Sequence, residues 1–208
     1  MKVLLVNGSP NVKGTCKFAL DVICERLNVE GIETEVFEIG TKGIPGCIGC
    51  NLCKTTGYCH IYDDKVNEFI NKCESADGFI FASPVYYASP NGTLLAFMDR
   101  VFYAGKHELF TLKPAASVLA ARRAGTTASF DVLNKYYTIN EMPIISSCYW
   151  NNIHGNSYEE AKEDLEGIRI MKTLANNMAY YLKMQKIANE NGLKKPEKEA
   201  RVLTNFIR

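Results

Sequence analysis

Short apolar runs of strand length alternate along the chain with longer stretches in which apolar residues recur at helical spacing. We expect a strand at each of the apolar runs, which are 3–6, 34–37, 78–82, 115–119 and 143–145. We expect a helix at each of the longer stretches, which are 15–29, 64–73, 92–103 and 158–183. This alternation is typical of a parallel sheet that is covered by helices on both faces.

The order of the elements predicts an α/β fold, a flavodoxin-like three-layer sandwich with a five-stranded parallel sheet. Right-handed crossovers favour the strand order 2-1-3-4-5. We place this domain at residues 1–186 and a polar C-terminal extension at residues 187–208. Sheets of this kind bind ligands at the carboxyl ends of their strands. The segments that follow strands one, three and four are therefore the first places to look for a site.

The loop after the first strand, residues 7–15, reads NGSPNVKGT. Its glycines permit sharp turns, and the helix that follows presents free N–H groups at its positive end. The loop has neither the GxGxxG pattern nor the Gly-Lys-Ser/Thr ending of the common nucleotide-binding loops, so a terminal monophosphate such as that of FMN fits better. The residues expected at the phosphate are Ser9, Asn11, Gly14, Thr15 and Cys16. The alternative is an ordinary turn with Thr15 as the N-cap of the helix.

The segments after strands three and four supply candidates for the flavin ring. An aromatic side chain can stack on the ring, and backbone N–H groups can meet its polar edge. The residues expected to frame the ring are Pro84, Val85, Tyr86, Tyr87 and Asn91. Arginine and backbone amides can stabilise negative charge on a reduced flavin, and the second loop offers Arg122, Arg123 and Gly125. The alternatives are a buried aromatic cluster and a solvated arginine pair.

Four segments of the chain resemble the NADPH-dependent FMN reductase family and its iron-sulfur flavoprotein branch. They are Gly8-Ser9-Pro10 with Gly14-Thr15, Ser83-Pro84-Val85-Tyr86, Phe97-Met98-Asp99-Arg100 and the segment from Cys47 to Asp64. The similarity extends over roughly residues 1–185. It implies an FMN-binding domain that uses NAD(P)H as co-substrate and assembles as a homodimer or homotetramer.

Four of the eight cysteines lie close together, at Cys47, Cys50, Cys53 and Cys59. Their spacing is the one associated with a [4Fe-4S] cluster in the iron-sulfur flavoproteins, and thiolates are the usual ligands of such clusters. Other family members that resemble this stretch act as plain flavin reductases, in which the cysteines are free thiols or a redox pair. Zinc is a further, poorer alternative at such close spacing. We expect Asp63 and Asp64 to cap the next helix rather than to bind metal.

Charge and hydropathy narrow the choice of partners. The 208 residues carry a formal net charge of +1, which argues against a nucleic-acid partner. There is no apolar run of membrane-spanning length and no signal-peptide pattern at the start of the chain, so we expect a cytoplasmic protein that does not associate with a membrane. After the predicted fifth strand, Trp150 and His154 are candidates for the substrate side of the flavin, although a structural role is common for a lone histidine.

The leading hypothesis is an FMN-dependent NAD(P)H oxidoreductase that passes electrons to a small-molecule or redox-protein acceptor. We assign no catalytic side chain, because hydride transfer relies on the chemistry of the cofactor. The first alternative is an iron-sulfur flavoprotein that carries electrons between protein partners. The second is a flavin-dependent dehydrogenase of a biosynthetic intermediate, of the 2-amino-4-deoxychorismate type.

Overall fold

The computed structural model describes residues 1–200 together with residues 202, 204 and 206. Its parallel strands have the order β2-β1-β3-β5-β6, and a short strand, β4, pairs antiparallel with the end of β3. The strands are β1 (Lys2–Asn7), β2 (Glu33–Glu38), β3 (Gly78–Tyr86), β4 (Ser89–Pro90), β5 (Ala115–Ala121) and β6 (Asn152–His154). Without β4, this is the predicted order, and the flavodoxin-like fold is confirmed.

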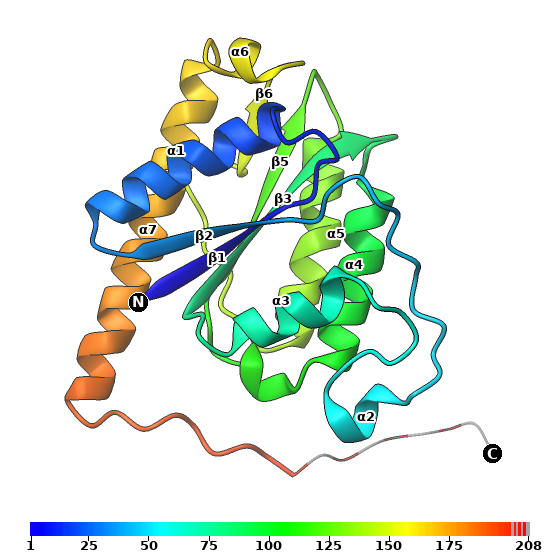
Figure 1. Cartoon of the computed structure of the whole chain (residues 1–208). Coiled ribbons are helices and arrows are strands. Elements are labelled where there is room, and N and C mark those ends of the chain that lie inside the picture. The colour runs from blue at the N-terminus through cyan, green and yellow to red at the C-terminus, as the bar shows by residue number, and fades with distance from the viewer. Residues whose placement is uncertain (201, 203, 205, 207–208) are drawn as a thin grey trace.

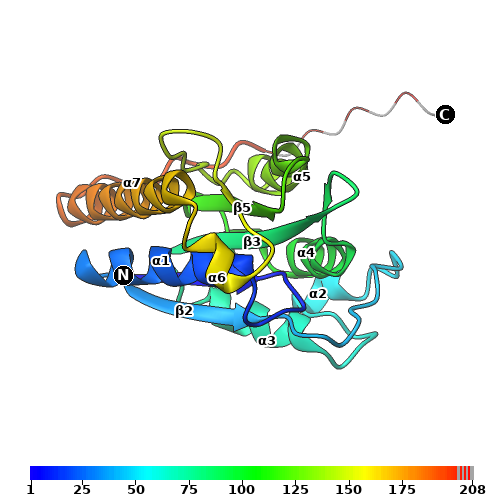
Figure 2. The same cartoon turned by 90° about the horizontal axis from the view of Figure 1, so that it is seen from above.

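Helices cover both faces of the sheet (Figure 1, Figure 2). On one face lie α1 (Thr15–Val29) and α7 (Leu165–Glu190), and on the other lie α3 (Lys65–Cys73), α4 (Gly92–Ala104) and α5 (Thr126–Ile139). The short helices are α2 (Cys53–Thr56), α6 (Tyr158–Ala161) and the 3-10 turn His107–Leu109. Neighbouring residues of a strand enter opposite cores, so that Leu5 packs on the first face and Leu4 on the second.

Local capping interactions set the ends of the first helices. Gly31, at φ 77°, follows α1, and the N–H group of Ile32 donates to the carbonyl of Leu27 at 3.0 Å. This is the expected glycine termination of a helix. Asp64 is the N-cap of α3, because its carboxylate accepts from the N–H group of Val66 at 3.1 Å. The predicted cap at Asp64 is therefore confirmed.

Helix α5 was missed by the sequence analysis, which named no helix between residues 119 and 143. Its buried positions are Ser129, Leu133 and Tyr137, and Phe130 and Tyr136 pack against the core while partly exposed. The helix also contains many threonine, serine and aromatic residues, whose helix propensity is low. Packing against the aromatic side chains of the core stabilises α5 instead. In addition, the hydroxyl group of Ser117 in β5 donates to the hydroxyl group of Tyr137 at 3.1 Å.

The fifth strand predicted at residues 143–145 is wrong, because the edge strand is interrupted. Ile144 forms only an isolated bridge with Ala115 at the start of β5. The chain then leaves the sheet and returns as β6, whose Asn152 pairs with Leu119 near the end of β5. The segment around Ile144 is apolar, whereas β6 is only partly apolar. A search for apolar runs could therefore find the first segment but not the second.

The predicted helix 158–183 is divided in the structure. The short α6 ends at Ala161, and α7 begins after Asp164, whose carboxylate accepts from the N–H group of Gly167 at 2.8 Å. Helix α7 continues to Glu190. Of the predicted extension 187–208, residues 201, 203, 205, 207 and 208 lie outside the described residues. No helix in the described part of the chain has both the length and the apolar character of a membrane span.

The packing of α5 predicts a stability difference between two leucine variants. Leu133 lies on the inner face of α5 and is fully buried, whereas Leu165 at the start of α7 is 74% exposed. Leu133→Ala should lower the free energy of unfolding by about 2–5 kcal/mol, because it leaves a cavity in the core. Leu165→Ala should change it by less than about 0.5 kcal/mol. Urea denaturation of the two variants measures both values, and equal losses would show that α5 does not pack as described.

Candidate functional site

Loops from distant parts of the chain meet at the carboxyl edge of the sheet, the upper edge in Figure 1. The N–H group of Gly8 donates to the carbonyl of Ala82 at 2.8 Å, which joins the loop after β1 to β3. The N–H group of Gly155 donates to the carbonyl of Ala121 at 3.2 Å, which joins the loop after β6 to the end of β5. The segments that the sequence analysis selected therefore lie at one edge.

The loop from residue 7 to residue 14 is organised by its own polar side chains. The side-chain oxygen of Asn7 accepts from the N–H group of Ser9, and the Ser9 hydroxyl accepts from the N–H group of Asn11, both at 3.1 Å. The side-chain oxygen of Asn11 accepts from the N–H group of Lys13 at 3.0 Å. This succession of local hydrogen bonds fixes the backbone that leads into α1.

The first turn of α1 is open to an anion. Its N-cap, Gly14, has no side chain that could accept from the first-turn N–H groups. Within the described residues, the first backbone hydrogen bond of the helix runs from the N–H group of Phe18 to the carbonyl of Gly14. The N–H groups of residues 15–17 are thus left for a ligand, at the positive end of the helix dipole.

The side chains of Thr15 and Cys16 point elsewhere. The Thr15 hydroxyl hydrogen-bonds to the carbonyls of Gly155 at 3.0 Å and Ser157 at 3.2 Å, so Thr15 is not the N-cap of the helix. The Cys16 side chain is 1% exposed, and burial raises the pKa of its thiol well above the usual value. What these two residues can offer an anion is therefore their backbone N–H groups.

A two-residue hairpin connects β3 to β4. Tyr87 at φ 51° and Ala88 at φ 58° form its turn, between the paired residues Tyr86 and Ser89. Two consecutive positive φ angles are those of a type I′ turn, in which glycine or asparagine is usual. The turn is therefore a strained feature of the kind found at functional sites. Tyr87 is fully exposed and Tyr86 is 49% exposed, so two aromatic rings stand at this edge without being part of the core.

Asn91 fixes the hairpin to the loop after β1. Its side-chain N–H₂ group donates to the carbonyl of Gly8 at 2.8 Å, and its side-chain oxygen accepts from the N–H group of Thr93 at 2.8 Å. Asn91 is thus also the N-cap of α4. Its own N–H group donates to the hydroxyl of Ser83 at 2.9 Å, just before the half-buried Pro84 and Val85.

The loop after β5 touches the hairpin from the other side. A Cβ atom on Gly125 would lie only 2.8 Å from the Cα atom of Ala88, and Gly125 has φ 91°. Glycine is therefore required both by the backbone angle and by the close approach. Arg122 and Arg123 are exposed in this loop, at the same edge as the two tyrosines.

A pocket beside this loop is lined by Thr126, Trp150 and His154. The ring of Trp150 packs edge-on against that of Tyr149, with centroids 4.6 Å apart. The backbone N–H group of His154 donates to the carboxylate of Asp164 at 2.7 Å. The structure therefore brings the lone tryptophan and His154 together, next to the loop that carries the arginine pair.

The four clustered cysteines line a second pocket, together with Arg100, Tyr103 and Ala104 of α4. Cys47 and Cys50 are exposed, Cys59 is half-buried and Cys53 is buried. Burial raises the pKa of the Cys53 thiol. In the described part of the chain, no three histidine, cysteine or acidic side chains are close enough together to hold a metal ion. The thiols thus share a pocket but do not form a closed ligand set.

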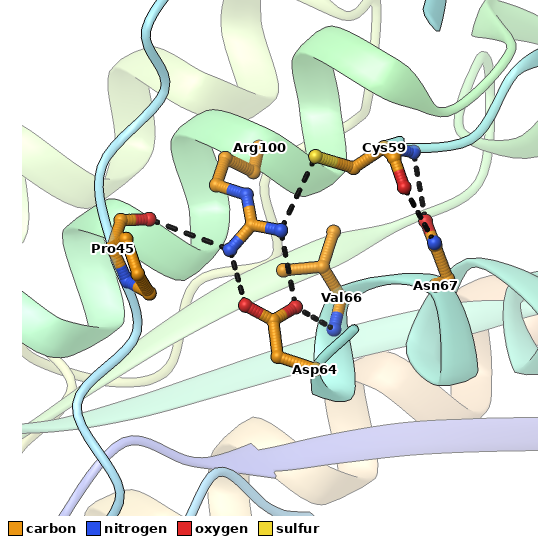
Figure 3. Close-up of polar contacts among 6 residues, drawn as sticks. All are labelled: Pro45, Cys59, Asp64, Val66, Asn67 and Arg100. Carbon is orange, nitrogen blue, oxygen red and sulfur yellow. Dashed lines mark hydrogen bonds and ion pairs between the residues drawn. The ribbon is translucent and has the colours of Figure 1, made fainter. Parts of the chain in front are cut away.

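Arg100, also in this pocket, belongs to the segment 97–100 that carries the family resemblance, but the sequence analysis gave it no role of its own (Figure 3). Its guanidinium donates to the Asp64 carboxylate at 2.5 and 3.1 Å and to the Cys59 sulfur at 3.2 Å. Burial alone would raise the pKa of the Cys59 thiol, but hydrogen bonds from the Ile61 backbone and from Arg100 lower it overall. The signal in the sequence is an arginine within the apolar stripe of a helix, at helical spacing from Phe97 and Ala104.

Comparison with known proteins agrees with this geometry. The family model described as NADPH-dependent FMN reductase matches residues 1–156. An iron-sulfur flavoprotein of Methanocaldococcus jannaschii is 30% identical over 193 residues, which cover 89% of this chain and 100% of the relative. An iron-sulfur flavoprotein of Methanosarcina thermophila is 26% identical over 190 residues, which cover 88% of this chain and 96% of the relative.

Solved structures with low sequence identity share the fold. The NAD(P)H:acceptor oxidoreductase FerB of Paracoccus denitrificans superposes with a TM-score of 0.65 at 13% identity, over 88% of this chain and 97% of that one. A flavodoxin from the domain Archaea gives a TM-score of 0.57 at 12% identity, over 88% of this chain and 99% of that one. Because the family model matches residues 1–156, which include every strand described above, the chain belongs to the NADPH-dependent FMN reductase family and is an oxidoreductase.

Proposed function

We propose that this chain is an FMN-dependent NAD(P)H oxidoreductase whose cysteine pocket holds a [4Fe-4S] cluster. The observation that carries the flavin part is the open first turn of α1, set where the loops after β1, β3, β5 and β6 meet. Bound FMN supplies the hydride and electron chemistry, and the protein supplies binding, orientation and electrostatics.

The phosphate fits the open turn by charge and by hydrogen bonding. The backbone N–H groups of Thr15, Cys16 and Lys17 would bind its oxygens, with the loop residues Ser9 and Asn11 beside them. These amides are fixed before a ligand arrives, because the hydrogen bonds of Asn7, Ser9 and Asn11 already order the loop. Little conformational entropy is then lost on binding.

The ring would lie beside the hairpin and the loop after β5, which contact each other at Ala88 and Gly125. Tyr86 and Tyr87 offer exposed aromatic faces, and Arg122 and Arg123 offer positive charge that can stabilise a reduced flavin. The pocket beside it, with Trp150 and His154, is the proposed place of the nicotinamide or of a small acceptor.

The donor chemistry of the cysteine pocket suits an iron-sulfur cluster. Cys47, Cys50, Cys53 and Cys59 line one pocket and would be its four thiolate ligands. The buried Arg100 donates to the Cys59 sulfur, and its positive charge, which Asp64 balances in part, offsets some of the negative charge that four thiolates bring. Relatives named iron-sulfur flavoproteins support the same assignment. The pocket also favours a second candidate function, a one-electron relay to a protein partner.

Anaerobic purification with a visible spectrum and a metal count tests the whole proposal. We expect one flavin and about four irons per chain, the number that the cluster type requires. NADPH or NADH, added without oxygen, should bleach the flavin absorption. A preparation that contains no flavin and does not bind added FMN would refute the proposal, whereas flavin with zinc in place of iron would refute only the cluster.

Substitution at the N-cap of α1 tests the phosphate site. Gly14→Asp should weaken FMN binding more than about tenfold, because its carboxylate would occupy the N–H groups that the phosphate needs and would repel the phosphate. Gly14 has φ −100°, and a Cβ atom there would only touch Asn11 at 3.4 Å, so the backbone accepts other residues. Quenching of flavin fluorescence measures the affinity for FMN of the variant and of the wild type.

Three controls accompany the Gly14→Asp variant. Gly14→Ala adds the Cβ atom without the carboxylate and should retain most of the affinity. Riboflavin, which lacks the phosphate, should bind the aspartate variant and the wild type about equally. The flavin-free aspartate variant should be at least as stable as the wild type, because aspartate is a favourable N-cap. Equal loss of FMN and riboflavin affinity would contradict a phosphate site at this turn.

Two exposed cysteines provide a matched test of the cluster ligands. Cys50 lies in the cysteine pocket, and Cys148 lies outside it, where its thiol contacts the hydroxyl of Thr173 at 3.7 Å. Cys50→Ser should lose most of the iron, while Cys148→Ser should keep it, with flavin content unchanged in both. Metal analysis of anaerobic preparations decides, and retention of full iron by Cys50→Ser would exclude Cys50 as a ligand.

A further inference from the structure

We propose that Arg100 is a positioning residue for the sulfur site, which holds Cys59 in place and makes the cluster easier to reduce. The inference rests on the cluster proposed above and concerns a residue that touches its ligand. Its basis is the set of contacts in Figure 3, where one buried side chain connects three points of the loop that carries the cysteines.

The guanidinium joins the two ends of the cysteine segment. It donates to the carbonyl of Pro45 at 3.4 Å, just before the first cysteine, and to the sulfur of Cys59 at 3.2 Å, which is the last. It also pairs with Asp64, where the segment enters α3. Arg100 belongs to α4, so a rigid helix of the domain core fixes both ends of an otherwise irregular loop.

The partners of Arg100 are themselves held in position. Asp64 is the N-cap of α3, and the side chain of Asn67, on the same helix, hydrogen-bonds to both the N–H group and the carbonyl of Cys59, at 2.8 and 2.7 Å. The Arg100 side chain is only 1% exposed, and it lies over the ring of Tyr62 at 4.8 Å. The Cys59 sulfur is therefore fixed relative to the core by a charged donor (Figure 3).

This arrangement has a direct consequence for electron transfer. A cluster becomes more negative when it accepts an electron, and a nearby positive charge stabilises that state. Hydrogen bonds to the ligating sulfur act in the same direction. Arg100 supplies both, and it does so in a buried position, where a charge is weakly screened. The carboxylate of Asp64 opposes part of the effect.

The two members of the ion pair should therefore shift the reduction potential in opposite directions. In the iron-loaded protein, Arg100→Gln should lower the midpoint potential of the cluster by the equivalent of at least a tenfold change in the equilibrium constant, about 59 mV for one electron. Arg100→Lys, which keeps the charge but loses the planar fork, should lower it less. Asp64→Asn, which leaves a good N-cap, should raise it. A spectroelectrochemical titration measures all of these potentials.

If Arg100 and Asp64 served only the stability of the loop, their variants would not shift the potential in opposite directions. Arg169→Gln, at an exposed arginine of α7 on the other face of the sheet, is the control and should leave the potential unchanged. If Arg100→Gln fails to fold, Arg100→Lys and Asp64→Asn still test the two opposite shifts of the midpoint potential. Shifts in one direction, or none beyond the control, would overturn the role of Arg100 while the wild type still carries iron. Absence of iron from the wild type would instead overturn the cluster and, with it, this inference.

The role of Arg100 in holding the cysteine segment can also be tested without any iron. In the iron-free protein, amide hydrogen exchange of residues 45–64 should be about tenfold faster or more in Arg100→Lys than in the wild type, because the two ends of the segment lose a shared anchor. Arg169→Gln should leave this exchange unchanged. Equal exchange in the wild type and Arg100→Lys would show that Arg100 does not hold the loop.

Discussion

The parallel pairing of β1, β3 and β5 is the constraint on which both sites depend. Because all three strands run in one direction, their carboxyl ends reach the same edge of the sheet, and the chain must leave that edge through loops. At that edge, N–H groups of the loops donate to carbonyls of the neighbouring strands, as in the bond from Gly8 to Ala82 of β3 and the bond from Gly155 to Ala121 of β5. One consequence is that a helix start without a side-chain cap, at Gly14, lies among loops that are already tied together.

Helix α4 connects this edge to the cysteine pocket. It begins at Asn91, whose side chain binds the loop after β1, and it carries Arg100 two to three turns later. At a rise of roughly 1.5 Å per residue, the two residues are separated by about 13 Å along the helix axis. Between them the inner face of the helix is buried, with Leu94 and Phe97 fully inaccessible. The two sites are thus attached to one rigid element, and a displacement of α4 would alter both.

The sequence predicts what depends on local pattern and fails where tertiary contacts decide. The runs at 3–6, 78–82 and 115–119 are buried on both faces, so their apolar character alone identifies them as central strands. Helix α5 has only Leu133 and Tyr137 as fully buried apolar residues, while Phe130 and Tyr136 pack against the core partly exposed, and its threonines and aromatics have low helix propensity. The cap at Asp64 follows from its position before a helix. Its second role, the pairing with Arg100, joins residues 36 positions apart and can be recognised only once α3 and α4 are adjacent.

The distribution of the thiols supports a specialised role for the cysteine pocket. Cys16 and Cys73 are buried in the two cores, where burial raises the pKa of each thiol well above its usual value, so both behave as small apolar side chains. In the cysteine pocket the sequence places four thiols beside a buried arginine, a residue that is costly to bury unless it is paired. Asp64 alone would satisfy that charge, as in an ordinary buried ion pair. The guanidinium also donates to the Cys59 sulfur. The ion pair does not require this contact, whereas a sulfur-ligated cluster would gain a hydrogen bond from it.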